Sequence, residues 1–83
     1  MSYNAIFYNK RGVLYYLIKD FQKALKDFNK AINIDKKNEM YFVNQGNTYL
    51  NLKENDKAKD SFKKALEINP NSNAAKNALN SLS

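Results

Sequence analysis

The sequence predicts an all-α domain built from antiparallel helix hairpins, with five helices. Two glycines and one proline among 83 residues leave few of the tight turns that an all-β domain needs. Aromatic residues make up 13% of the chain, more than a disordered segment normally holds. The third observation is an internal repeat, described next. A chain this short holds one domain, which we place at residues 1–83.

The repeat appears when residues 5–38 are laid over residues 39–72, a shift of 34 positions. Nine positions are identical, and they include both glycines of the chain. The identical pairs are Gly12/Gly46, Tyr15/Tyr49, Lys19/Lys53, Lys23/Lys57, Ala24/Ala58, Phe28/Phe62, Lys30/Lys64, Ala31/Ala65 and Ile34/Ile68. A period of this length is typical of solenoid proteins, in which each unit packs on its neighbours.

The first repeat contains two predicted helices. Residues 5–18 are apolar around most of the helix circumference, which indicates a helix packed between neighbours. Asp20 follows the break in this pattern and is a candidate N-cap for the second helix. From Phe21 onward, apolar residues recur three and four positions apart, and lysines occupy the opposite side.

The second repeat follows the same plan, with predicted helices at 39–52 and 55–68. The run Asn69-Pro70 ends the second of these, because proline cannot continue a helix. Residues 73–83 form a predicted capping helix that begins with Asn73 as its N-cap. Its apolar stripe would cover the open face of the second repeat, and consists of Ala75, Ala78, Leu79 and Leu82.

The repeated residues carry a resemblance to a known family, the tetratricopeptide repeat. The pattern is Tyr8…Gly12-x-x-Tyr15…Ala24-x-x-x-Phe28-x-x-Ala31, and again Phe42…Gly46-x-x-Tyr49…Ala58-x-x-x-Phe62-x-x-Ala65…Pro70. The resemblance covers residues 5–72. It implies a right-handed superhelix (an α-solenoid) in which the small residues let the two helices of each hairpin approach closely and the aromatic residues fill the space between them.

Two features depart from the family pattern. Arg11 and Gln45 stand where the family usually has leucine, so this layer is more polar than usual. Lys36 replaces the closing proline in the first repeat, which leaves residues 33–41 without a firm helix stop. We therefore hypothesise that this junction can straighten and let two chains exchange hairpins.

The composition argues against several functions. The chain has no histidine and no cysteine, which removes the usual general base, the thiolate nucleophile and the commonest metal ligands. We therefore expect that the chain is not an enzyme and that it binds no cofactor and no metal ion. The longest apolar run, residues 13–18, is far too short to span a membrane, and residues 1–4 do not resemble a signal peptide. By default, the expected location is cytoplasmic.

In the resembled family, the first helices of the repeats line a concave groove that holds peptides or partner helices. At the equivalent positions of this chain, the predicted partner-binding groove consists of Ile6, Asn9, Lys10, Val13, Tyr16, Leu17, Met40, Val43, Asn44, Asn47, Leu50 and Asn51, with Asn77 and Ala78 from the capping helix. We expect the apolar members to form an exposed patch and the asparagines to hydrogen-bond a peptide backbone. The expected partner is a protein or peptide.

Three other functions were considered beside peptide binding in the groove: self-association, RNA binding and the clamping of acidic chaperone tails. Self-association is the second candidate, because two repeats and a short cap are marginal alone and a homodimer would fill the groove. Salt-sensitive RNA binding by the outer lysines is the third, although interspersed aspartates favour a solvated face and nucleic acid is not an expected partner. Some family members clamp acidic chaperone tails, but Asn9 and Val13 replace the expected lysine and asparagine, and Ala74 and Ala78 replace a basic pair.

Overall fold

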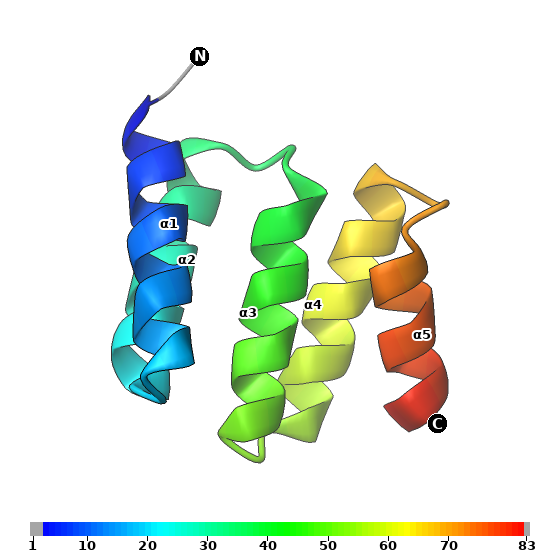
Figure 1. The fold of residues 1–83 in the computed structure, drawn as a ribbon. Helices are drawn as coiled ribbons and strands as arrows, with labels where there is room; N and C mark the ends of the chain where they lie inside the picture. Colours follow the sequence, from blue (N-terminus) through cyan, green and yellow to red (C-terminus); the bar gives the residue numbers. More distant parts are fainter. Residues whose placement is uncertain (1–2, 83) are drawn as a thin grey trace.

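The computed structural model describes residues 3–82, which form five α-helices and no strand. The helices are α1 (Tyr3–Leu17), α2 (Phe21–Ile34), α3 (Glu39–Asn51), α4 (Asn55–Ile68) and α5 (Asn73–Leu82). Helices α1 and α2 form one antiparallel hairpin, α3 and α4 form the next, and α5 lies beside α4 at the far end of the superhelix (Figure 1). The predicted fold class and the five helices are confirmed.

Each hairpin closes on a contact between a glycine and a phenylalanine. A Cβ atom placed on Gly12 would lie 2.7 Å from Cε1 of Phe28, and one on Gly46 would lie 2.6 Å from Cε1 of Phe62. Both phenylalanines are fully buried, and the alanines beside them are equally inaccessible. The small residue in the first helix is therefore what allows the ring of the second helix to fill the space between them.

Both hairpin turns use a lysine in the left-handed region. Lys19 has φ 66° and Lys53 has φ 64°. In the first turn, the amide of Lys19 donates to the carbonyl of Tyr16 (3.0 Å) and the amide of Asp20 donates to that of Tyr15 (2.9 Å). This pair of bonds is the Schellman motif, and the second repeat forms the equivalent pair. The Asp20 carboxylate also accepts from the amide of Lys23 (3.2 Å), which confirms it as an N-cap.

The turns that end each repeat also share one geometry. Asp35 and Asn69 have nearly the same backbone angles (φ −134° and ψ 99°; φ −135° and ψ 96°), and each side chain accepts from the amide two residues on. Asn38 then caps α3 by accepting from the amide of Met40 (3.0 Å). The junction does have a helix stop although Lys36 replaces the proline, because an aspartate turn at Asp35 ends α2 at Ile34. The exchange of hairpins between two chains stays a hypothesis.

Helix α5 covers the second hairpin as predicted. Ala75 is buried in the core cluster around Phe62, and Ala78, Leu79 and Leu82 pack against this cluster. The predicted N-cap was wrong by one residue. Asn73 is the first residue of α5, and the hydroxyl of the buried Ser72 accepts from the amide of Ala75 (3.3 Å). Ser72 takes this role because it precedes the first helical residue and has a short side-chain acceptor.

Candidate functional site

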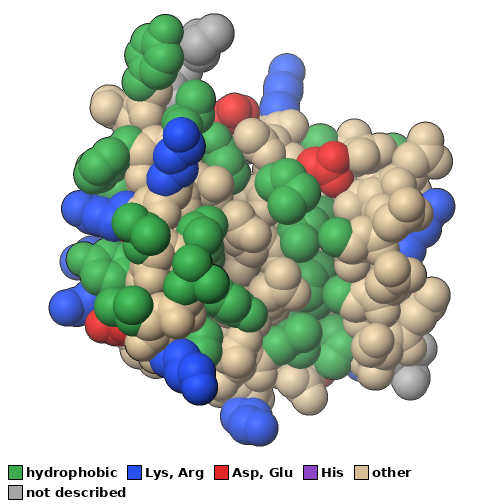
Figure 2. Space-filling model, viewed as in Figure 1, with side chains coloured by type: hydrophobic (Ala, Val, Ile, Leu, Met, Phe, Trp, Pro, Cys, Tyr) green, Lys and Arg blue, Asp and Glu red, His purple; other side chains and the backbone are tan. Residues whose placement is uncertain are grey.

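The inner face of the superhelix is formed by α1 and α3, with α5 at its edge (Figure 1). Seen from this side, hydrophobic side chains gather over α1 and again between α3 and α5 (Figure 2). Between α1 and α3 lies a cavity of about 250 Å³, whose lining consists of Val13, Tyr16, Leu17, Phe28, Asn44 and Asn47. Five of these six residues belong to the predicted groove, and Phe28 contributes its floor from α2.

The predicted groove residues differ in how far solvent reaches them. The exposed members are Ile6, Lys10, Leu17, Met40 and Asn51. The half-buried members are Asn9, Val13, Tyr16, Asn44, Asn47 and Leu50, and of the two cap positions Asn77 is exposed and Ala78 half-buried. The apolar surface that a partner would meet is therefore smaller than the sequence suggested.

Val43 does not belong to the exposed patch. It is only 3% exposed and packs in the core cluster with Ala58, Phe62 and Ala75. The expectation of an exposed Val43 was wrong, because α5 lies against the second hairpin and closes the space at this end of α3. The residue equivalent to Val43 in the first repeat is the polar residue Asn9, so the comparison of the two repeats did not indicate a buried position.

Asparagines join the two groove helices to each other. The Nδ2 of Asn44 donates to the Oδ1 of Asn9 (2.9 Å), and the Nδ2 of Asn51 donates to the hydroxyl of Tyr16 (2.9 Å). These side chains are thus partly occupied within the fold. The side-chain amide of Asn47 makes no hydrogen bond to any described residue, although the backbone carbonyl of Asn47 accepts from Nδ2 of Asn51 (3.0 Å). The cavity therefore presents the side-chain amide of Asn47, without a partner among the described residues, beside apolar walls.

The groove carries little charge. Helix α3 contains no lysine or arginine, and Lys10 is the basic residue of the predicted set. The neighbouring Arg11 points elsewhere, because its Nε and Nη2 donate to the two carboxylate oxygens of Asp27 (2.8 and 2.9 Å). This hydrogen bonding raises the pKa of Arg11 above its usual value, so the guanidinium stays charged. A peptide in the groove would meet a largely neutral surface.

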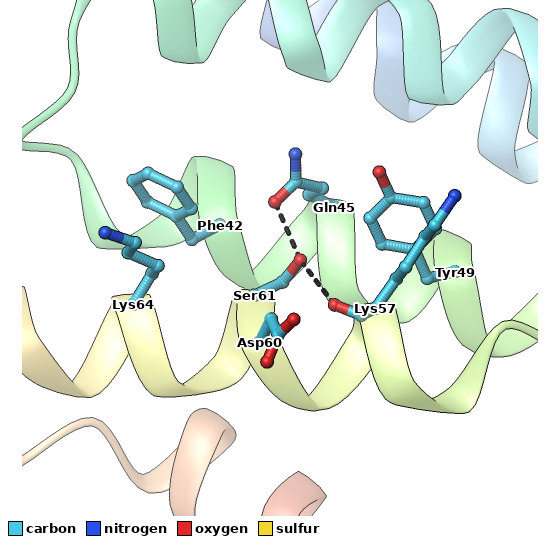
Figure 3. A pocket seen from close by; sticks show the side chains of 7 residues that line it. All are labelled: Phe42, Gln45, Tyr49, Lys57, Asp60, Ser61 and Lys64. Carbon is cyan, nitrogen blue, oxygen red and sulfur yellow. Dashed lines mark hydrogen bonds between the residues drawn. The ribbon is translucent and has the colours of Figure 1, made fainter.

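The polar layer formed by Arg11 and Gln45 is satisfied in two ways. In the first repeat Arg11 pairs with the buried Asp27. In the second repeat the equivalent partners are Gln45 and Ser61, and the Ser61 hydroxyl donates to the Gln45 side-chain carbonyl (2.7 Å; Figure 3). From the sequence, only Arg11 and Gln45 were predicted to belong to this polar layer, without their partners Asp27 and Ser61. The missed signal is that both members change together between the repeats.

The outer side of the hairpins holds a second cavity, of about 370 Å³ (Figure 3). Its lining consists of Phe42, Gln45, Tyr49, Lys57, Asp60, Ser61 and Lys64. Lys57 forms an ion pair with Glu54 (3.2 Å) and Lys64 one with Glu67 (3.8 Å), so both amines have local carboxylate partners. This arrangement fits the solvated face expected for the outer lysines.

Within residues 3–82, no group of three acidic, histidine or cysteine side chains is arranged to hold a metal ion. No helix in the same range combines the length and apolar character needed to cross a bilayer.

Comparison with known proteins agrees with the repeat. The tetratricopeptide repeat profile matches residues 5–38 and 41–72, and no curated protein sequence matches the chain. Among solved structures, the Arabidopsis OM64 TPR domain superposes with a TM-score of 0.92 at 33% identity, covering 95% of this chain and 65% of that one. The first TPR of Spaghetti (RPAP3), bound to the HSP90 peptide SRMEEVD, gives 0.92 at 26% identity, with 96% and 64% coverage.

The second TPR domain of human RPAP3, in complex with the HSP70 peptide SGPTIEEVD, gives a TM-score of 0.91 at 26% identity, covering 95% of this chain and 66% of that chain. The present chain thus spans slightly less than two thirds of the length of these domains. Repeat period, hairpin geometry, profile match and structural similarity all agree, and the chain belongs to the tetratricopeptide repeat family.

Proposed function

We propose that this chain is a non-catalytic protein-interaction module that binds a peptide or partner helix along the inner face of α1 and α3. The observation that carries the proposal is the cavity between the two helices, where the side-chain amide of Asn47, which has no hydrogen-bond partner among residues 3–82, lies beside Val13 and Leu17. An amide can donate to a peptide carbonyl and accept from a peptide amide, while the apolar walls accept a side chain.

The expected ligand is a largely uncharged peptide with apolar side chains. Two structural neighbours hold peptides that end in EEVD, which carry several carboxylates. The clamp that the family uses for such tails is incomplete at Asn9 and Val13 in this chain, and α3 offers no cation. Lys10 alone provides weak attraction for a single carboxylate.

The test is a selection of random displayed peptides against the 83-residue chain. Binding of the selected peptides would then be measured for the wild type, for Leu17→Asp and for Asn47→Ala. Leu17 is 68% exposed, so its replacement changes the groove surface without opening the core. Leu14→Asp is the matched control, because Leu14 is 63% exposed on the same helix but lies outside the groove set.

We expect Leu17→Asp and Asn47→Ala to weaken the selected peptides by about tenfold or more, and Leu14→Asp to leave them unchanged. The peptide SRMEEVD should bind more weakly than the selected sequences. Selected peptides that ignore both groove substitutions, or that prove uniformly acidic, would contradict the proposal.

Self-association is the second candidate. It is favoured by the exposed side chains of Ile6, Leu17 and Met40, which a second chain would remove from water. Light scattering over a wide concentration range tests it, since a chain that stays monomeric would exclude a homodimer that fills the groove. A hairpin-swapped dimer through residues 33–41 would show in the same measurement. Salt-sensitive RNA binding, the third candidate, gains no support from the lysines that already face carboxylates.

A further inference from the structure

One face of α1 lies outside the groove and carries a stripe of large side chains. Phe7, Arg11 and Leu14 follow one another on α1 at spacings of four and three residues, and Ile18 follows four residues later, in the turn that ends the helix. We call this set the stacking face. Phe7 is 54% exposed and Ile18 is 72% exposed. Among residues 3–82, α1 is the first helix of the array, and α3 follows it on the other side (Figure 1).

The second repeat shows what covers such a face. The equivalent residues are Tyr41, Gln45, Thr48 and Leu52. Tyr41 is 4% exposed where Phe7 is 54% exposed, and Thr48 is 0% exposed where Leu14 is 63% exposed. In both repeats the first helix packs against its own second helix, and a further helix follows the hairpin. Neither of these helices explains why the first repeat is more exposed at these positions than the second.

The cover on the second repeat is helix α2. Tyr41 packs in one cluster with Ala31 and Ile32, and Gln45 Nε2 donates to Asn29 Oδ1 (2.7 Å). Helix α2 therefore covers this face with an apolar stripe and with one polar side chain, Asn29, which lies opposite Gln45. On α1 the same positions lack such a helix among the described residues. The geometry of the face therefore matches an antiparallel helix laid upon it.

The surroundings of the stacking face are basic. Beside it lies a cavity of about 170 Å³ lined by Arg11, Tyr15, Lys23, Lys26, Asp27 and Lys30. Lys23 forms an ion pair with Asp20 (Nζ to Oδ2, 3.8 Å), and Nζ of Lys30 lies 5.1 Å from the centre of the Tyr8 ring. Arg11 uses Nε and Nη2 on Asp27, while Nη1 makes no hydrogen bond to a described residue. The equivalent cavity of the second repeat has Gln45 and Asp60 in place of two of these cations.

We propose that the stacking face docks an amphipathic helix of a partner protein, whose apolar stripe is flanked by carboxylates. The partner helix lies on α1 as α2 lies on α3. A carboxylate at the position that matches Asn29 accepts from Nη1 of Arg11. A second one, just beyond the last turn of the partner helix at the position that matches Lys36, faces Lys30. The latter placement follows because Lys36, in the turn after α2, lines one cavity with Lys64, the equivalent of Lys30.

A second copy of this chain fits the face poorly. The far end of the array is α5, whose exposed residues are Asn73, Ala74, Lys76, Asn77, Asn80 and Ser81, so it offers no large apolar stripe for head-to-tail stacking. Two stacking faces brought together would place two basic cavities side by side, in a chain of net charge +6. Like charges at such an interface oppose association.

The probes are two synthetic peptides of residues 21–38, the segment that covers α3 within the fold. The acidic probe carries Asn29→Glu and Lys36→Glu, and the control peptide carries Asn29→Lys with Lys36 retained. Both keep the apolar stripe, and circular dichroism checks that their helicities match. Each is titrated into the 83-residue chain at low salt and at physiological salt.

We expect saturable binding of the acidic probe, at least about tenfold tighter than the control peptide and weakened by salt. Leu14→Asp should abolish it, Leu14→Thr, which carries the residue of the second repeat, should weaken it, and Leu17→Asp should leave it intact. These variants separate this proposal from the groove, where Leu17→Asp and not Leu14→Asp reduces binding.

Three results would overturn the proposal. The first is absent or equal binding of the two peptides. The second is binding that responds to Leu17→Asp and not to Leu14→Asp, which would assign the peptide to the inner groove. The third is a wild-type dimer that Leu14→Asp converts to monomer, which would assign the face to a second copy.

Discussion

The first and second hairpins have the same backbone plan but differ in their polar partners and in their cover. Both place a glycine against a buried phenylalanine, and both turn through a left-handed lysine. The first uses an ion pair, Arg11 with Asp27, where the second uses a hydrogen bond, Gln45 with Ser61. The glycine–phenylalanine contact and the lysine turn are thus common to both repeats, whereas both members of the polar pair differ between them.

The largest expected effect comes from the shared ring. Phe28→Ala and Phe62→Ala should each lower the free energy of unfolding by about 3–5 kcal/mol, because both rings are fully buried and their removal leaves a cavity. Urea unfolding followed by circular dichroism measures the change. Leu14→Ala is the control on the exposed side of α1, with an expected change within about 0.5 kcal/mol. A similar loss for Leu14 would contradict the comparison.

The glycines come next. Gly12→Ala and Gly46→Ala should each cost about 1–3 kcal/mol, because the new methyl group meets the phenylalanine ring at less than 3 Å. This loss outweighs the gain of about 1 kcal/mol that alanine brings to a helix interior. Thermal and urea unfolding of both variants give the values. Stabilisation in either repeat would show that the helices can separate without loss.

The polar layer can be exchanged between the repeats. Arg11→Gln alone should lower the unfolding midpoint, because it leaves the buried Asp27 carboxylate without its charged partner. The double variant Arg11→Gln/Asp27→Ser reproduces the pair of the second repeat and should recover much of the loss. The double-mutant cycle measures this coupling. Strict additivity of the two single changes would indicate that the pair does not act as a unit.

The smallest effect concerns pH. Burial, with the nearby charge of Asp35, raises the pKa of Tyr41, whereas its equivalent Phe7 does not titrate. The neutral phenol is favoured in the fold, so its contribution to stability is present below the unfolded pKa of about 10 and is lost as pH rises through the folded pKa. Tyr41→Phe should therefore make unfolding less pH-dependent above about pH 10. Parallel urea titrations of wild type and variant would reveal equal slopes if this account is wrong.

The two helix hairpins were predictable from the sequence because the same pattern of residues occurs in both repeats. The 34-residue shift aligned Gly12 with Gly46 and Phe28 with Phe62, which is sufficient for the hairpins and their closest contact. The exposure of Val43 was predicted wrongly because it depends on a neighbouring element. Val43 packs in the core cluster to which α5 contributes Ala75.

The turns were harder to predict for a different reason. The end of each repeat was predicted from the presence or absence of a proline, which only the second repeat has, as Pro70. In the structure, the aligned residues Asp35 and Asn69 supply the side-chain acceptor that ends each repeat. The groove could be placed by helical periodicity, but its hydrogen bonds could not. Whether Asn44, Asn47 or Asn51 is free depends on distances to α1, such as the 2.9 Å between Asn44 and Asn9.

The most direct test of the peptide-binding groove is the NMR spectrum of the asparagine side-chain amides during titration with a selected peptide. Asn47 has no partner for its side-chain amide among the described residues, so its signals should shift most, while Asn44 and Asn51 keep their bonds to α1 and shift less. Signals of the stacking face should stay in place. Large shifts at Phe7, Leu14 and Ile18 with an unchanged Asn47 would contradict the account and remove the inner groove as the binding surface.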